Sequence, residues 1–132
     1  MALTFAQPDR RLTLTVARTG RHVTIAAVGR IDLATESPWH EEVMRACTAA
    51  DETTRVCVDL TEVTFLSWAS TAVLVRAHRA CARRGRTLRV VASGPVLTGL
   101  HVTRLHEDIT IIPGLRPVEV TRPRAATGWL IA

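Results

Sequence analysis

The chain has 132 residues, of which 47% are hydrophobic and 22% charged. At roughly 100–200 residues per domain, this length predicts one compact domain, and the composition excludes a wholly disordered chain. No apolar run reaches the roughly 18 residues that a membrane helix needs, and arginines interrupt the N-terminal region before a signal-peptide core could form. We therefore expect no membrane insertion and a cytoplasmic location.

The 17 basic and 12 acidic residues give a formal net charge of +5, and every basic residue is arginine. Asparagine and tyrosine are absent as well, so the codon bias of a GC-rich genome explains the composition more simply than nucleic-acid binding does. The absence of lysine from this sequence excludes a Gly-Lys-Ser/Thr phosphate loop and Schiff-base chemistry.

Cysteine and histidine spacing gives no sign of a metal site or a cofactor. Cys47, Cys57 and Cys81 lack a Cys-x-x-Cys spacing and each lies in an apolar pattern, so we expect reduced core residues. The five histidines fall on different predicted elements without a partner set typical of metal ligation.

The first elements along the chain are two strands and a helix. Alternating apolar and polar residues over 12–16 and a second run over 22–28 predict a hairpin of half-buried strands. Ser37, followed by Pro38, is typical of a helix start, and a helix from here would bury Trp39 and Val43.

The second half of the chain alternates strand and helix. Residues 55–60 predict a central strand buried on both faces, followed by a turn at Thr61 and Glu62. Ser67 caps a second predicted helix that ends at Arg84-Gly85. Its expected inward stripe consists of Ser70, Val73, Ala77, Ala80 and Cys81. A strand at 87–91, a short helix opened by residues 93–95 and a last strand at 109–112 complete the pattern.

This order predicts an α/β fold in which a mixed sheet carries an N-terminal hairpin and helices pack on the sheet. We expect an N-terminal arm over residues 1–11, one domain over 12–114, and a C-terminal tail over 115–132 that could dock through Trp129, Leu130 and Ile131.

Three segments resemble the STAS domain of anti-sigma factor antagonists. They are the runs 28–35 (VGRIDLAT), 56–66 (VCVDLTEVTFL) and 83–91 (RRGRTLRVV), which occur in the family's order, and the resemblance covers about residues 12–112. It implies a single STAS-like domain, a non-enzymatic role in transcription regulation, and binding to an anti-sigma factor of the serine-kinase type.

The family's phosphorylation motif, Asp-Ser-Ser-Gly, is altered in this sequence. Ser67 takes the place of the aspartate, Trp68 that of the phosphoacceptor serine, Ala69 that of the second serine, and Ser70 that of the glycine. Position 68 has no hydroxyl, so the family's switch cannot operate there. Ser67, Ser70 and Thr71 remain as nearby hydroxyls, for which capping and packing are the simpler explanations.

Two interpretations of Trp68 remain open: an aromatic anchor for a partner, or a side chain that folds inward to fill the core. The resemblance places Asp32 beside this loop and matches Asp59 to the aspartate that ends the family's central strand. Both could equally be loop-forming carboxylates that accept backbone N–H groups, and this structural role is favoured for Asp59. The expected partner-binding residues are Asp32, Ser67, Trp68, Ala69, Ser70, Thr71 and Arg76.

One stripe of arginines would form if the second helix continued to Arg86; it would consist of Arg76, Arg79, Arg83 and Arg86. The stripe is either a solvated helix face or a ridge that meets an acidic partner.

The leading hypothesis is a protein-binding module of the anti-sigma factor antagonist type. A STAS module of another assembly, in lipid transport or stress signalling, is the alternative. A nucleic-acid-binding module is a weaker alternative because aromatic residues are only 4% of the chain, and the sequence has no nucleophile elbow or dinucleotide fingerprint of an enzyme.

Overall fold

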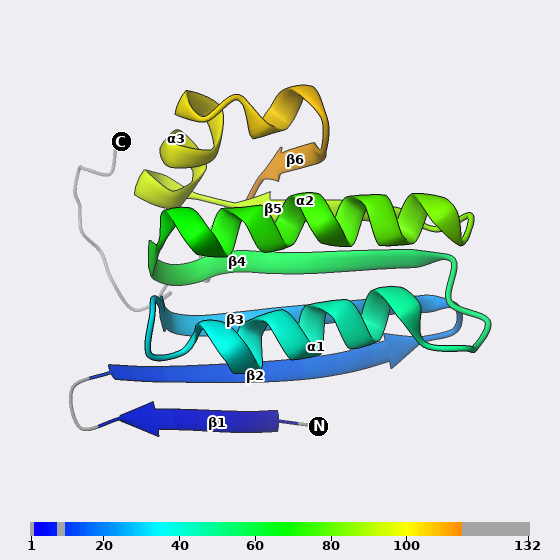
Figure 1. The fold of residues 1–132 in the computed structure, drawn as a ribbon, viewed down its shortest axis with the longest axis horizontal. Helices are drawn as coiled ribbons and strands as arrows, with labels where there is room; N and C mark the ends of the chain where they lie inside the picture. Colours follow the sequence, from blue (N-terminus) through cyan, green and yellow to red (C-terminus); the bar gives the residue numbers. More distant parts are fainter. Residues whose placement is uncertain (1, 8–9, 115–132) are drawn as a thin grey trace, which may run out of the picture.

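The computed structural model describes residues 2–7 and 10–114. In chain order its elements are β1 (Ala2–Gln7), β2 (Arg10–Thr19), β3 (His22–Ile31), α1 (Glu36–Thr48), β4 (Arg55–Leu66), α2 (Trp68–Arg83), β5 (Thr87–Ala92), α3 (Gly94–Val102), a 3-10 turn (Leu105–Glu107) and β6 (Thr110–Pro113). The strands form one sheet in sequence order (Figure 1), antiparallel from β1 to β3 and parallel from β3 to β6. This confirms the predicted α/β class and the mixed sheet with its N-terminal hairpin.

The strand β1 was not predicted from the sequence, which assigned residues 1–11 to an arm. β1 pairs antiparallel with β2, in a register that sets Ala2 opposite Thr15 and Gln7 opposite Arg10. It therefore extends the predicted hairpin into a three-stranded antiparallel section. The division into arm, domain and tail stays a prediction, and the C-terminal tail lies outside the described residues.

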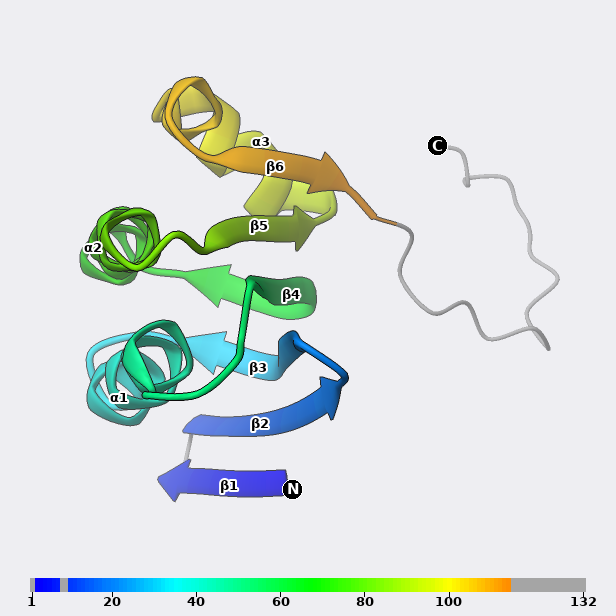
Figure 2. The same ribbon diagram turned by 90° about the vertical axis from the view of Figure 1, so that its right-hand side faces the viewer.

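The core lies between the sheet and its helices. Figure 2 shows α1 and α2 on the same side of the sheet, and the buried residues of the strands include Ile25, Val58 and Val90. The residues that alternate with them in β4, Cys57 and Asp59, are only half-buried. The expectation that this strand is buried on both faces was therefore wrong, because no described helix covers its second face.

The helix α1 begins earlier than expected. Its N-cap is Thr35, whose carbonyl accepts a hydrogen bond from the Trp39 N–H at 3.3 Å. Ser37 is therefore not the cap but lies inside the first turn. Pro38 is tolerated in this first turn because the N–H groups there have no partner within the helix.

The strand β4 runs past the turn expected at Thr61 and Glu62. Asp59 Oδ1 accepts hydrogen bonds from the Thr61 N–H at 2.9 Å and from the Thr61 hydroxyl at 2.7 Å. Pairing with β5 stops at Asp59, but pairing with β3 resumes at Glu62 after an irregularity and continues to Leu66. The prediction of a turn was wrong because the chain changes its pairing here without leaving the sheet, and Asp59 has the local structural role that was favoured for it.

The helix α2 confirms its predicted cap, end and inward stripe, all of whose residues are buried. It ends at Arg83, however, so Arg86 does not belong to the arginine stripe. The Arg86 side chain is buried and donates hydrogen bonds to the carbonyls of Ala46, Cys47 and Ala49 at the end of α1. A cation is stabilised there because a helix C-terminus exposes unpaired carbonyls and partial negative charge.

The three cysteines are free thiols. Cys47 and Cys81 are buried in the core as expected, whereas Cys57 is half-buried on the second face of the sheet. Burial raises the pKa of the Cys57 thiol above its ordinary value, an effect that the positive charge of Arg89 opposes and the negative charge of Asp59 reinforces.

Candidate functional site

The junction between β4 and α2 is fixed from two sides. The Ser67 N–H donates to the carbonyl of Ile31, at the end of β3, over 2.9 Å. Ser67 Oγ accepts from the Ser70 N–H at 3.2 Å and lies 2.8 Å from Ser70 Oγ. The Ser67 side chain thus caps α2, as predicted, and the cap holds the first turn of the helix against the sheet.

Trp68, the first residue of α2, points out of the core. Its side chain is 75% exposed, whereas Trp39 on α1 is fully buried and donates its indole N–H to the Ser70 carbonyl at 3.3 Å. The interpretation that Trp68 folds inward therefore does not describe this structure. An exposed tryptophan on a helix end is a large apolar surface, and the described residues leave three quarters of it uncovered.

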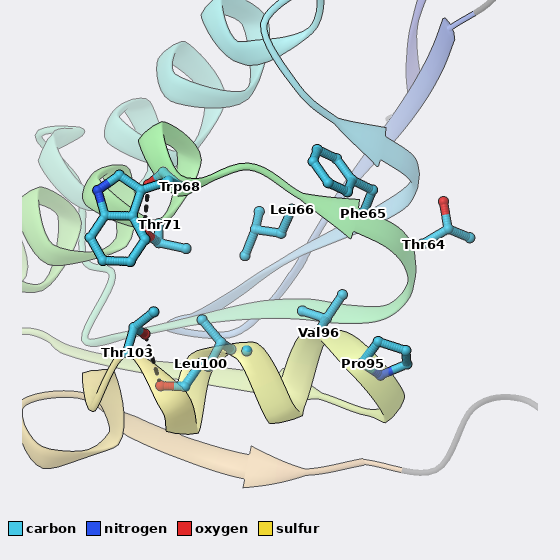
Figure 3. Close-up of a pocket in the computed structure, with 10 residues that line it drawn as sticks. Thr64, Phe65, Leu66, Trp68, Thr71, Pro95, Val96, Leu100 and Thr103 are labelled. Atoms are coloured by element: carbon cyan, nitrogen blue, oxygen red, sulfur yellow. Dashed lines mark hydrogen bonds between the residues drawn. The ribbon is translucent and has the colours of Figure 1, made fainter.

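A groove separates the beginning of α2 from α3 (Figure 3). Its volume is about 280 Å³, and its walls come from the end of β4, from α2 and from α3. The apolar side chains in these walls are those of Phe65, Leu66, Trp68, Pro95, Val96 and Leu100. The site that the sequence predicted as a loop is therefore one edge of an apolar groove.

Asp32 lies beside this region but is not accessible. Its carboxylate is buried and accepts hydrogen bonds from the Ala34 N–H at 3.0 Å and from Arg30 Nε at 3.3 Å. Thr35 joins the same loop through a hydroxyl that accepts from the Asp32 N–H at 3.0 Å. The Asp32 side chain shapes the loop between β3 and α1, and the residue that this loop exposes is Leu33, at 85%.

The hydroxyls around position 68 are already engaged within the chain. Ser70 is fully buried and shares its hydrogen bond with Ser67. The Thr71 hydroxyl donates to the Trp68 carbonyl at 2.6 Å. Ser70 has no access to an enzyme in this state, and phosphate transfer to Thr71 would first have to break this bond.

The other predicted site residues lie along α2. Ala69 and Arg76 are exposed, and so are Arg79 and Arg83. The structure thus places Ser67, Trp68, Ala69 and Thr71 on one accessible edge, with Arg76 further along the helix. Asp32 and Ser70 support this edge from beneath.

Sequence reasoning missed three exposed apolar residues, of which Phe65 lines the groove. Leu33 is exposed in the loop after β3, Val102 is 74% exposed at the end of α3, and Phe65 is 41% exposed near the end of β4. The Arg30 guanidinium carbon stands 4.6 Å from the centre of the Phe65 ring, a cation–π contact that holds the ring. The sequence could have indicated Leu33, because it is an apolar residue within a polar loop. It could not have indicated Phe65 and Val102, because their positions in the apolar pattern are typical of core residues.

Within residues 2–7 and 10–114, no group of three or more His, Cys, Asp or Glu side chains could hold a metal ion. None of the helices described is both long enough and apolar enough to cross a membrane.

Known proteins share this fold. A crystal structure of an anti-sigma factor antagonist from Mycobacterium paratuberculosis matches with a TM-score of 0.72 and 23% identity, over 84% of this chain and 92% of that chain. The anti-sigma factor antagonist SpoIIAA in its unphosphorylated form matches with a TM-score of 0.62 and 10% identity, over 77% of this chain and 89% of that chain. The phosphorylated Bacillus SpoIIAA matches with a TM-score of 0.58 and 11% identity, over 74% and 89%.

No similar protein was found among curated proteins. A family model described as "Mlab, STAS domain" matches residues 14–113, which include every described element from β3 to β6. Since this match covers most of the chain and the fold is that of the anti-sigma factor antagonists, the chain belongs to the STAS domain family.

Proposed function

We propose that the chain is a non-enzymatic protein-binding module that docks an anti-sigma factor at the edge formed by Ser67, Trp68, Ala69 and Thr71. The observation that carries this proposal is the 75% exposure of Trp68 at the beginning of α2. Exposed aromatic side chains beside a groove are typical anchors of protein interfaces. Arg76 extends the docking surface along α2, and Asp32 and Ser70 position it.

In this proposal, phosphorylation at position 68 does not control the binding of the partner. A phosphoserine at a helix N-terminus adds nearly two negative charges to the surface that a partner meets, which is a basis for switching. Trp68 cannot accept phosphate, so the surface presented to the partner stays apolar. Regulation of transcription would then depend on the amounts of the two proteins.

The same surface also fits the second candidate, a STAS module of another assembly. The matching family model carries the description "Mlab, STAS domain", which names the domain but no anti-sigma factor and is therefore compatible with this candidate too. The two candidates predict docking at the same edge and differ in the identity of the protein that docks.

Site-specific photo-cross-linking tests the proposal. A photoreactive amino acid replaces Ala69, which is exposed beside Trp68, and a matched control carries it at Thr15, which is exposed on β2. In the native cell we expect a discrete protein adduct from position 69, none from position 15, and loss of the adduct when Trp68→Ala is added.

Mass spectrometry of the adduct identifies the partner and separates the two candidates. An anti-sigma factor in the adduct supports the first, and a component of a transport or stress-signalling complex supports the second. Adducts of equal yield from both positions, or adducts that survive Trp68→Ala unchanged, would contradict the proposed docking edge.

A further inference from the structure

The groove between α2 and α3 has an apolar interior. Its lining contains three threonines, Thr64, Thr71 and Thr103, and no charged side chain. Each threonine hydroxyl donates to a backbone carbonyl: Thr64 to Gly29 at 3.2 Å, Thr71 to Trp68 at 2.6 Å and Thr103 to Leu100 at 3.0 Å. Because these donors are engaged, the interior favours an apolar group over a phosphate or a carboxylate.

The helix that forms one wall of the groove carries only positive charge. The sequence of α2 contains no acidic residue, and its exposed arginines are Arg76, Arg79 and Arg83. Among the residues that the structure describes, none of these arginines takes part in an ion pair. A partner with negative charge facing α2 would therefore gain attraction without displacing an existing pair.

Helical spacing connects the apolar and the charged parts of this surface. Residues 68, 75 and 79 are separated by seven and four positions, so Trp68, Val75 and Arg79 lie on one face of α2. With a rise of about 1.5 Å per residue, this line is about 17 Å long. Of this line, Trp68 lines the groove, and Val75 and Arg79 lie beyond it. The length suits about three turns of a helix that begins in the groove and continues along α2.

We infer that the groove binds an amphipathic, acidic helix of the protein partner. The apolar face of the helix enters between Trp68 and α3, and its carboxylates face Arg79 and the neighbouring arginines of α2. This inference rests on the proposed function, because it names the chemistry of the partner segment that docks at the same edge.

Synthetic peptides test the inference without knowledge of the partner. Three 16-residue helical peptides are compared: one with a leucine face and a glutamate face, a twin with lysine in place of glutamate, and a twin with alanine in place of leucine. Isothermal titration with the full chain should show the acidic leucine peptide binding at least about tenfold more tightly than either twin, a difference of about 1.4 kcal/mol.

A groove-filling variant tests where the peptide binds. Gly99 lines the groove, and a Cβ atom built on it meets nothing within 4 Å. The Gly99→Leu variant should therefore fold normally, with an unchanged melting temperature, and should weaken binding of the acidic peptide at least about tenfold. Gly99→Ala is the matched control and should change the affinity by less than about threefold.

Charge reversal tests the role of the arginines. Arg79→Glu should weaken binding about tenfold at low salt, and the loss should shrink as salt rises because exposed charges are screened. Arg21→Glu changes the net charge equally at an exposed residue of the turn between β2 and β3, and it should have little effect. Equal losses from both substitutions would overturn the inference.

Three further results would overturn the inference: equal binding of the lysine twin, unchanged binding to Gly99→Leu, and no binding of the acidic peptide to the wild type. The two proposals fail separately. A Trp68-dependent adduct at position 69 without peptide binding leaves the proposed function intact and removes this inference. Peptide binding without any cellular adduct removes the proposed function instead.

Discussion

At position 68 the chain carries the largest side chain where related antagonists are expected to carry a serine, and the structure leaves that side chain in solvent. The two tryptophans of the described helices have different roles because one is buried and the other is exposed. Trp39 has no exposure and a hydrogen-bonded indole N–H, whereas Trp68 is 75% exposed. The same residue type therefore stabilises the core in one case and is available for binding in the other.

The Trp68→Ala substitution should separate binding from stability. Because the side chain is exposed, the free energy of unfolding should change by less than about 0.5 kcal/mol. Affinity for the cross-linked partner should fall by about 2 kcal/mol or more, or roughly thirtyfold, if Trp68 is an interface anchor. Urea unfolding and titration with the partner measure the two quantities.

The core comparator is Trp39→Ala, which should cost about 3–5 kcal/mol of stability because it leaves a cavity. If Trp68→Ala destabilised the fold as much as Trp39→Ala does, with binding lost only through unfolding, Trp68 would be a core residue and not an anchor.

The loop hydroxyls should not be phosphorylated. Incubation with ATP and an anti-sigma factor kinase should leave the mass of the chain unchanged, because position 68 lacks a hydroxyl and Ser70 is fully buried. Intact-mass spectrometry checks this, with the Trp68→Ser variant as a positive control for kinase activity. A stoichiometric phosphate on Ser67, Ser70 or Thr71 of the wild type would restore a regulated switch at this loop.

At the scale of the elements, the segment that follows α2 holds the C-terminal end of α1 in place. The turn at Gly85 has a φ of +70°, a backbone conformation that favours glycine, and it directs Arg86 back to the end of α1. Arg86 also lies 3.4 Å from the Asp51 carboxylate, which in turn pairs with Arg18 at 2.8 Å. One buried guanidinium thus joins the end of α1 to the loop before β4.

Removing the Arg86 guanidinium should destabilise the fold. Arg86→Ala leaves the carbonyls of Ala46, Cys47 and Ala49 without this donor, and we expect a loss of about 2 kcal/mol or more. Arg83→Ala, at an exposed position three residues earlier, is the matched control and should stay within about 0.5 kcal/mol. Chemical unfolding that gave equal values for the two variants would show that Arg86 is not a structural residue.

The Asp51 carboxylate should make the free energy of unfolding decrease as the pH becomes acidic. Its pKa lies below the ordinary value of 3.8, mainly because Thr53 donates side-chain and backbone hydrogen bonds to it, with smaller effects of Arg18 and Arg86. A lowered pKa in the folded state means that the carboxylate contributes stability above its unfolded pKa and loses this contribution as pH falls through the folded value.

The unfolding free energies of wild type and Asp51→Asn should therefore differ by a constant amount at neutral pH. The difference should shrink as pH falls below about 4. Urea unfolding at a series of pH values measures it. A difference that grew on acidification would mean that the Asp51 carboxylate does not stabilise the fold.

At the scale of the whole molecule, the sequence predicted the parts that depend on local pattern. Alternating residues identified β2 and β3, and Ser67 and Gly85 marked the beginning and end of α2. These signals are short-range, so they are present in a single sequence. The family resemblance, also carried by short motifs, is confirmed by the match over residues 14–113.

The missed features depend on contacts between distant segments. β1 exists because β2 offers a free edge, and β4 continues past Asp59 because β3 still pairs with it. The inward direction of Arg86 depends on where α1 ends, and the groove depends on how α3 packs beside α2. None of these positions can be computed from the spacing of residues along the chain.

Hydrogen–deuterium exchange of the chain with and without the cross-linked partner tests the central claim most directly, since it maps the docking surface without any substitution. The claim predicts protection at the first turns of α2 after Ser67 and along α3 from Pro95 to Thr103. Protection confined to β1 and β2, with unchanged exchange in α2 and α3, would contradict it.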